Sequence, residues 1–395
     1  MKRLTLLLLG LALGVASTAS AQGLTMQMSN GWSFTFAGNV NVFWSFTKQN
    51  TTAGDAANSS VRTGLLPAFA TFEAKGKEAG LNLGVHFGFA PQIQNAGVHD
   101  QFGAQIDMRQ VYLTIGFKDG SQILAGRELG LFGRQNILND MTLFGIGAVG
   151  IGLDQGGGTT LGRIGFGYIY PNFNAQVTYS TKPGEAQFSV GLFQPSVLGG
   201  GVSPYAFTAI PRVEGEFTYN GKSGKNSYMF WVGGLWQSTK NAATGGNTAS
   251  SIGGTAGIKA GMSDLSLVVS AYIGKGLGTT LMFSGGEVAA NGTDLRKSDG
   301  GYAQLMYKVG PKTNVGFSWG FSRLVNDQTG DGNTNVRSNN YAYTIGFYHQ
   351  WTKSLKFVLE GTEEGTTGNT LGPIFAGLPP GAKQTDIGAG FMLFF

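Results

Sequence analysis

The stretch Gln384–Phe395, QTDIGAGFMLFF, decides how the chain is expected to fold. One parity of this stretch is largely apolar and carries Thr385, Ile387, Ala389, Phe391, Leu393 and Phe395, while the other opens with Gln384, Asp386, Gly388 and Gly390. This two-residue period predicts a β-strand with one apolar face and one polar face. A soluble domain would bury the apolar face against a second layer, whereas a membrane barrel would turn it to lipid and close this strand onto the first one.

The N-terminus has the features of a secretory signal peptide. Lys2 and Arg3 precede an apolar run over 4–15, and Ala19-Ser20-Ala21 offers a cleavage site of small residues. We therefore expect a signal peptide over 1–21 and one exported domain over 22–395, because the run is too short for a membrane anchor. No later run is long enough for a helical span, and the chain has no cysteine for a disulfide or a lipid anchor. Export without these features leaves the periplasm, the exterior or the outer membrane.

The composition disfavours helical architectures and nucleic-acid binding. Charged residues make up 12% of the chain and glycine contributes 66 residues, so good helix formers are scarce. Without Lys2 and Arg3, the 27 basic and 22 acidic residues leave a net charge of +3. That charge is too small to indicate a nucleic-acid partner.

The clearest alternation in the chain runs from Trp32 to Phe46. Even positions are mostly apolar, with Trp32, Phe34, Trp44 and Phe46 at the two ends and smaller residues between them. This distribution is typical of a strand that crosses an apolar band about 25 Å tall between two aromatic girdles. We expect residues 32–46 to pair with the terminal strand.

The connections between strands alternate in length. Tight turns such as 76–80 and 118–121 exchange with longer polar stretches such as 48–62, 91–104 and 238–254. Short turns at one end and long loops at the other are typical of a membrane barrel. We predict an all-β fold, a transmembrane antiparallel β-barrel of sixteen strands, with 173–181 counted as one strand. Pro171-Asn172 would also fit a turn between two strands.

Two parts of the chain are expected in the lumen. The third long connection, about 128–170, exceeds the others, and a loop of this length is usually functional. Placed inside a barrel, it would narrow the pore. Arg212, Glu214 and Glu216 share one parity of a strand, and we place them on the lumenal wall because charges are costly in lipid.

Several short motifs resemble the trimeric porins of Gram-negative outer membranes. Arg109-Gln110-Val111-Tyr112-Leu113 and Ala125-Gly126-Arg127 resemble the fourth and fifth strands of that family. Beyond the long loop, Leu161-Gly162-Arg163-Ile164 and Pro171-Asn172-Phe173 resemble the entry to its sixth strand. The terminal Phe391, Leu393 and Phe395 resemble its signal for the barrel-assembly machinery.

The resemblance implies a homotrimer whose long third loop faces a basic wall across a constriction. By position, Arg109, Arg127 and Arg163 would form the basic side, and Asp140 and Asp154 are the acidic candidates on the loop. The family usually has a further arginine on the second strand, where this chain has Thr71. Periodicity alone leaves Arg109 ambiguous, because it shares parity with Val111; the resemblance favours an inward arginine. The alternative is that these arginines pair with carboxylates near the rim and serve only folding.

Catalytic and metal-binding motifs are not convincing. Gly316-Phe317-Ser318-Trp319-Gly320 fits a hydrolase pattern, but it lies within an alternating strand rather than on a strand-to-helix elbow. Asp327 to Gly332 copies the start of a calcium loop, yet Ser338 occupies the place of the bidentate glutamate. His86, His99 and His349 are dispersed. We therefore expect no cofactor, no metal and no enzymatic activity.

The sequence thus predicts an outer-membrane porin through which small hydrophilic solutes and ions diffuse passively. Outer-membrane lipid and lipopolysaccharide are the expected surroundings. A substrate-selective channel for a sugar, phosphate or organic acid is the alternative, and an adhesin or a barrel enzyme is less favoured, because no set of catalytic groups converges near the rim.

Overall fold

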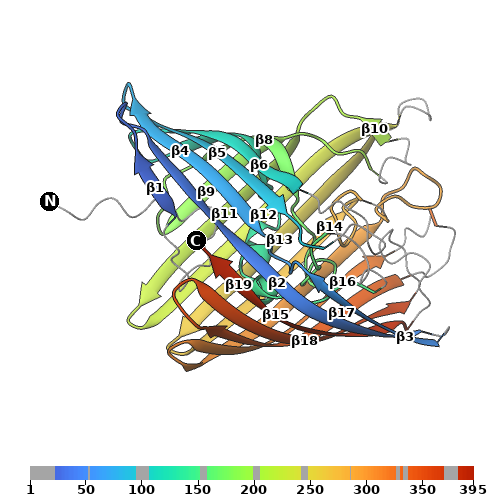
Figure 1. Cartoon of the computed structure of the whole chain (residues 1–395). Coiled ribbons are helices and arrows are strands. Elements are labelled where there is room, and N and C mark those ends of the chain that lie inside the picture. The colour runs from blue at the N-terminus through green and yellow to red at the C-terminus, as the bar shows by residue number, and fades with distance from the viewer. Residues whose placement is uncertain are drawn as a thin grey trace.

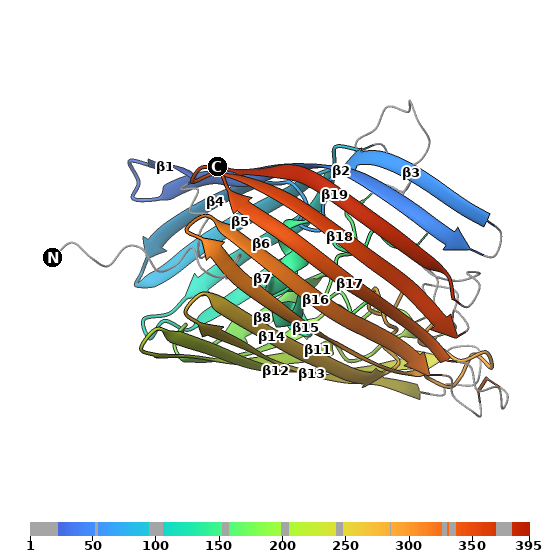
Figure 2. The same ribbon diagram turned by 90° about the horizontal axis from the view of Figure 1, so that it is seen from below.

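The computed structural model describes residues 23–51, 54–94, 106–151, 158–198, 205–241, 248–284, 286–325, 330–331, 337–368 and 381–395. Within these residues the chain forms one antiparallel sheet that closes on itself (Figures 1 and 2). Closure occurs between β2 (Ser33–Thr51) and β19 (Lys383–Phe394), where Val40 pairs with Leu393 and Lys48 with Thr385. The predicted pairing of the first and last strands is confirmed.

The rest of the barrel wall follows the order of the chain. It consists of β4 (Phe69–Glu78), β5 (Leu81–Pro91), β6 (Ile106–Gly116), β7 (Gln122–Leu129), β8 (Phe173–Ser180), β9 (Ala186–Phe193), β11 (Arg212–Ser223), β12 (Asn226–Asn241), β13 (Thr248–Met262), β14 (Leu265–Lys275), β15 (Lys297–Gly310), β16 (Thr313–Val325), β17 (Arg337–Gln350) and β18 (Leu355–Gly368). Each strand is antiparallel to its neighbours, so all of the backbone ladder is satisfied within the wall, as a lipid environment requires.

Three short strands extend this wall without adding to its circumference. β1 (Leu24–Gln27) pairs with the start of β2. β3 (Gly54–Arg62) pairs with the far half of β2, whose near half pairs with β4. β10 (Tyr205–Phe207) pairs with the end of β12 beyond β11. Counting β3 with β4 and β10 with β11, and leaving out β1, gives sixteen strands over the described chain, as predicted.

Burial follows the parity that the sequence indicates. On β2, Val40, Val42 and Trp44 are exposed on the outside, while Asn39 and Asn41 are buried within the barrel. On β19, the odd positions face outward and Gln384, Asp386 and Met392 lie inside. The exposed outer surface is therefore apolar and the inner surface largely polar, the arrangement of a barrel that stands in lipid around an aqueous space.

The two ends of the barrel differ. Seven tight turns and the end of β19 lie at one end of the barrel, and the strand ends that the longer connections join lie at the other (Figures 1 and 2). Two stretches expected to be loops are partly strand, because β2 and β3 continue their ladder through most of 48–62, and β12 and β13 do the same over 238–254. Polar residues can continue a ladder beyond the apolar band, since the backbone hydrogen bonds do not depend on lipid. No helix in the described chain is long and apolar enough to span a membrane.

Phe395 lies at the seam that closes the barrel. Its backbone N–H donates to the Gly38 carbonyl at 3.0 Å, the Gly38 N–H donates back to the Phe395 carbonyl at 2.9 Å, and its ring lies 5.2 Å from that of Phe36. The role of the C-terminal Phe391, Leu393 and Phe395 in assembly stays a prediction.

Deletion of Phe395 is expected to lower the amount of assembled barrel, because the last pair of hydrogen bonds at the seam is lost. The surviving barrels should behave like the wild type in single-channel recordings. Assembly can be measured as the fraction that migrates as a compact species on unheated gels. Phe347→Ala, which removes another outward aromatic ring away from the seam, is the control, and an equal loss in both variants would contradict a special role for Phe395.

Candidate functional site

The chain between β7 and β8, residues 130–172, enters the barrel and is called the inserted loop below. It contains α1 (Arg134–Leu138) and a short 3-10 helix, η1 (Met141–Phe144). Ile137, Met141 and Ile146 of the loop belong to a buried apolar cluster inside the barrel. The wall contributes Trp231, Val268, Tyr302, Tyr348, Val358 and Met392 to this cluster, all from β12, β14, β15, β17, β18 and β19. The loop therefore packs against one side of the barrel by burying apolar surface.

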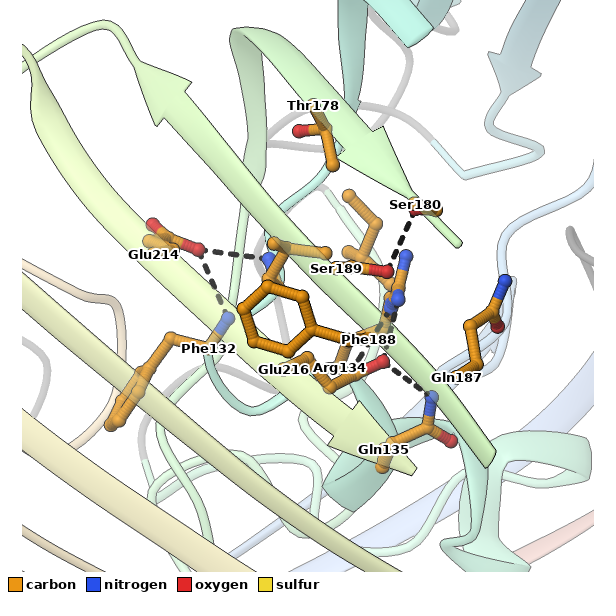
Figure 3. Close-up of polar contacts among 12 residues, drawn as sticks. Phe132, Arg134, Gln135, Thr178, Ser180, Gln187, Phe188, Ser189, Glu214 and Glu216 are labelled. Atoms are coloured by element: carbon orange, nitrogen blue, oxygen red, sulfur yellow. Dashed lines mark hydrogen bonds and ion pairs between the residues drawn. The ribbon is translucent and has the colours of Figure 1, made fainter. Parts of the chain in front are cut away.

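Buried carboxylates of the wall accept hydrogen bonds from the backbone of the inserted loop. Glu360 on β18 accepts from the N–H groups of Ile146 and Gly147, both at 2.7 Å. Three further carboxylates repeat the arrangement, Asp386 with the Val149 N–H at 3.0 Å, Glu364 with the Gly150 N–H at 2.9 Å and Glu214 with the N–H groups of Leu131 and Phe132 at 2.8 and 3.0 Å. Figure 3 shows the contact between Glu214 and Phe132.

These contacts provide acceptors for N–H groups of the irregular loop backbone. A loop in the lumen has no neighbouring strand to accept its N–H groups, and a buried N–H without an acceptor is costly. A carboxylate oxygen accepts two such groups and makes stronger bonds than a neutral acceptor. Glu214, Glu360, Glu364 and Asp386 are called the anchoring carboxylates below, and they hold the loop at its start, 131–132, and in its middle, 146–150.

The beginning of the loop is also held by ion pairs. Arg134 on α1 contacts Glu216, to which Gln135 also donates at 3.1 Å (Figure 3). Arg212 lies 2.7 Å from Glu214, and neither side chain has exposed surface. The structure thus places Arg212, Glu214 and Glu216, which the sequence assigns to the lumenal wall, on the inner face of β11, in contact with the loop or with one another.

Arg163 and Asp140 lie together in the packed part of the loop. Arg163 is fully buried and donates to the carbonyls of Ser318 and Ala342 at 2.6 Å each. Asp140 accepts from the Thr142 hydroxyl and the Tyr168 hydroxyl, both at 2.8 Å. Burial raises the pKa of Asp140, and the nearby charge of Arg163 opposes that rise. Arg163 therefore holds the loop against β16 and β17, and Asp140 holds two parts of the loop together, rather than facing solvent.

Arg109 and Arg127 lie elsewhere. Arg109 contacts Asp107 at 3.0 Å, Tyr170 at 3.3 Å and the ring of Phe173, next to an irregularity in the pairing of β5 and β6. Arg127 is exposed. It pairs with Val111 and Ala175, and by parity it belongs to the outward face of β7. The structure does not gather Arg109, Arg127 and Arg163 into one basic wall, and any effect of theirs on conduction stays a prediction.

Two other expectations about this region have simple outcomes. Asp154, the second acidic candidate, lies outside the described residues. Thr71, at the position where the resemblance leads one to expect arginine, donates its hydroxyl to the Ala37 carbonyl at 2.9 Å.

One face of the loop stays open to the lumen. Within 131–151, only Arg134, Gln135, Leu138 and Phe144 keep partial exposure. The first three are one and four residues apart, so they share one side of α1, while Ile137 faces the packed side. Of residues 131–151, this open face is the part that a solute in the lumen can meet.

Two lysines flank the open face, and the sequence analysis missed both. Lys259 on β13 donates to the Asn139 side chain at 3.3 Å. Lys356 on β18 lies 3.9 Å from the centre of the Phe144 ring. Neither makes an ion pair within the described chain. The available signal was parity, because Lys259 lies one residue after the outward Ile258 and Lys356 lies three residues before the outward Leu359, so both belong to the inward parity of their strands.

Residues of the hydrolase-like and calcium-like motifs make structural contacts. Ser318 is buried on the inner face of β16, where its carbonyl accepts from Arg163. Asp331 of the calcium-like stretch pairs with Arg296 at 2.7 Å. No group of three or more potential metal ligands occurs among the described residues.

Comparisons with known proteins agree with this architecture. A family model described as Gram-negative porin matches residues 5–369. The outer membrane channel DcaP of Acinetobacter baumannii is similar over 94% of this chain and 99% of its own, with 14% identity and a TM-score of 0.65. An anion-selective porin from Comamonas acidovorans matches over 92% and 100%, with 14% identity and a TM-score of 0.63. The trimer form of OmpT from Vibrio cholerae matches over 92% and 100%, with 12% identity and a TM-score of 0.54. The comparison with curated proteins returned no match.

Glu360→Gln is expected to loosen the inserted loop. The neutral amide oxygen is a weaker acceptor for the N–H groups of Ile146 and Gly147, so their hydrogen exchange should accelerate about fivefold, which corresponds to about 1 kcal/mol. Exchange of the peptide covering 145–151 can be followed by mass spectrometry in detergent.

Glu363→Gln is the matched control for this experiment. Glu363 lies on the same strand but points outward, 3.9 Å from Lys383 and half exposed. Exchange that is unchanged in Glu360→Gln, or equally faster in both variants, would contradict the anchoring role of Glu360.

Proposed function

Because the chain belongs to the Gram-negative porin family, it is an outer-membrane channel for passive diffusion, and we propose that its inserted loop selects the solutes. The observation that carries the proposal is the open face of the loop, formed by Arg134, Gln135, Leu138 and Phe144 inside a closed barrel. The loop is packed on β12 to β19, so the remaining lumen lies between this face and the inner side of β4 to β9.

Passage through this space requires no chemical step. Small hydrophilic solutes exchange part of their hydration for contacts with polar side chains, and the width beside the loop limits their size. Polar groups on the opposite wall include Glu73, His86, Gln110, Gln176 and Thr178, all on the inward parity of their strands. Porins are channels rather than enzymes.

The charge near the loop supports a preference for anions. Lys259 and Lys356 flank the open face without an ion-pair partner in the described chain, whereas Arg134 is neutralised by Glu216. Further lysines occupy the inward parity toward the tight-turn end, where Lys75 pairs with Glu73 and the others are Lys77, Lys222 and Lys308. Positive charge along a narrow aqueous path raises the local concentration of anions. Among the selective alternatives, phosphate or an organic acid is therefore favoured over a neutral sugar.

The assembly and surroundings follow from the family. We propose a homotrimer, in line with the trimer form of the structurally similar OmpT. Lipid and lipopolysaccharide around the barrel, and the barrel-assembly machinery acting on the C-terminal strand, are proposed partners. The signal peptide over 1–21 stays a prediction, since these residues lie outside the described chain.

Recordings in a planar bilayer test the proposal. The purified protein is expected to give discrete conductance steps, and under a salt gradient its reversal potential should indicate anion preference. Lys259→Gln with Lys356→Gln should shift that potential toward cations, because the unpaired positive charge beside the loop is removed.

Lys48→Gln with Lys383→Gln is the control, because these two cations are exposed on the outward parity of β2 and β19. The reversal potential of this double variant should equal that of the wild type. An absence of conductance steps would contradict the open channel, and a shift as large in Lys48→Gln with Lys383→Gln as in Lys259→Gln with Lys356→Gln would contradict the assignment of selectivity to Lys259 and Lys356.

A further inference from the structure

A groove of about 540 Å³ lies on the outer wall of the barrel across β16, β17 and β18. Its lining includes Trp319, Phe321, Arg323, Tyr341 and Tyr343. These residues occupy the outward parity of their strands, because the intervening Ser318, Gly320, Ser322 and Ala342 are buried inside. The groove therefore opens toward the membrane and not toward the lumen.

The groove lies at the loop end of the apolar band. Arg323 is ten residues along β16 from Thr313, which begins the strand at the tight-turn end. At about 3.3 Å per residue and a tilt of about 45°, this places Arg323 roughly 23 Å from that end. The apolar band of such barrels is about 25 Å tall. Arg323 therefore lies at the boundary where acyl chains give way to headgroups, and the aromatic rings lie just inside it.

A row of cations continues from the groove onto the neighbouring strands. Lys275 on β14 and Lys297 on β15 are paired across the sheet, and both are exposed. Arg323 lies on the neighbouring β16, two residues nearer the membrane centre than this pair of lysines. It forms an ion pair with Asp299. Neither lysine makes an ion pair within the described chain. This outer face thus carries two uncompensated positive charges beside an aromatic groove.

The opposite part of the same rim is different. Lys48 on β2 lies 3.5 Å from Asp55, and Lys383 on β19 lies 3.9 Å from Glu363. These outward cations at the loop end are compensated by carboxylates, so they offer no net charge to a ligand. Exposed outward cations without an ion pair in the described chain therefore gather over β12 to β16, where Lys240 on β12 is a further one, and not at this part of the rim.

We propose that this face binds lipid A, the phosphorylated and acylated disaccharide of lipopolysaccharide. Lys275, Lys297 and Arg323 contact its phosphates, and an acyl chain occupies the groove over Trp319 and Tyr343. The long-loop end of an outer-membrane barrel faces the cell exterior, where this lipid forms the leaflet. Aromatic side chains at the interface and basic side chains above them match a ligand with an apolar body and an anionic head.

Binding can be measured by native mass spectrometry of the detergent-solubilised protein with added lipid A. Lys275→Gln with Lys297→Gln is expected to weaken binding about thirtyfold, because each lysine contributes about 1 kcal/mol to holding an anionic headgroup. Lys48→Gln with Lys383→Gln is the matched control and should bind like the wild type. Compact migration on unheated gels shows that each variant is folded.

The chemistry of the ligand is tested by two further lipids. Lipid A from which the phosphates have been removed should bind as weakly to the wild type as intact lipid A does to Lys275→Gln with Lys297→Gln. An equal affinity for intact and dephosphorylated lipid A, or an equal loss in the control variant, would overturn the proposal. Phosphatidylglycerol binding as tightly as lipid A, with the same dependence on the lysines, would replace lipid A by a phospholipid.

Discussion

The organisation of the lumen depends on wall carboxylates that accept the backbone N–H groups of the inserted loop. A barrel satisfies its own backbone around the circumference, but a segment that leaves the wall for the interior loses those partners. Glu360 and Glu214 each accept two loop N–H groups, and Glu364 and Asp386 accept one each. These contacts stabilise the irregular backbone and determine which face of the loop remains open.

Because the loop is held on one side, the lumen has two unlike walls. The side over β12 to β19 is filled by the apolar cluster around Ile146 and Met141, whereas Arg134, Gln135 and Leu138 on the open face of α1 keep partial exposure. Charge follows the same division. Arg163 donates its hydrogen bonds to carbonyls of the wall, while Lys259 and Lys356 lie at the edge of the open face.

Local patterns predicted the barrel well and the constriction poorly. The alternation in 384–395 and 32–46 is a property of neighbouring residues, so it indicated lipid-facing strands and their closure, while the length of the connection over about 128–170 indicated the inserted loop. The role of Arg163 depends on the carbonyls of Ser318 and Ala342, which are 155 and 179 residues away. No local period encodes such contacts. Lys259 and Lys356 were missed for the same reason, because only their contacts with the inserted loop place them beside its open face.

The most direct test of the account uses the lack of cysteine in the chain. Single substitutions Gln135→Cys on the open face and Val190→Cys on the outer surface of β9 can be treated with a charged thiol reagent during single-channel recording. The account predicts a stepwise fall in conductance for Gln135→Cys and none for Val190→Cys. If Gln135→Cys is fully modified and its conductance does not change, the inserted loop does not border the conducting path.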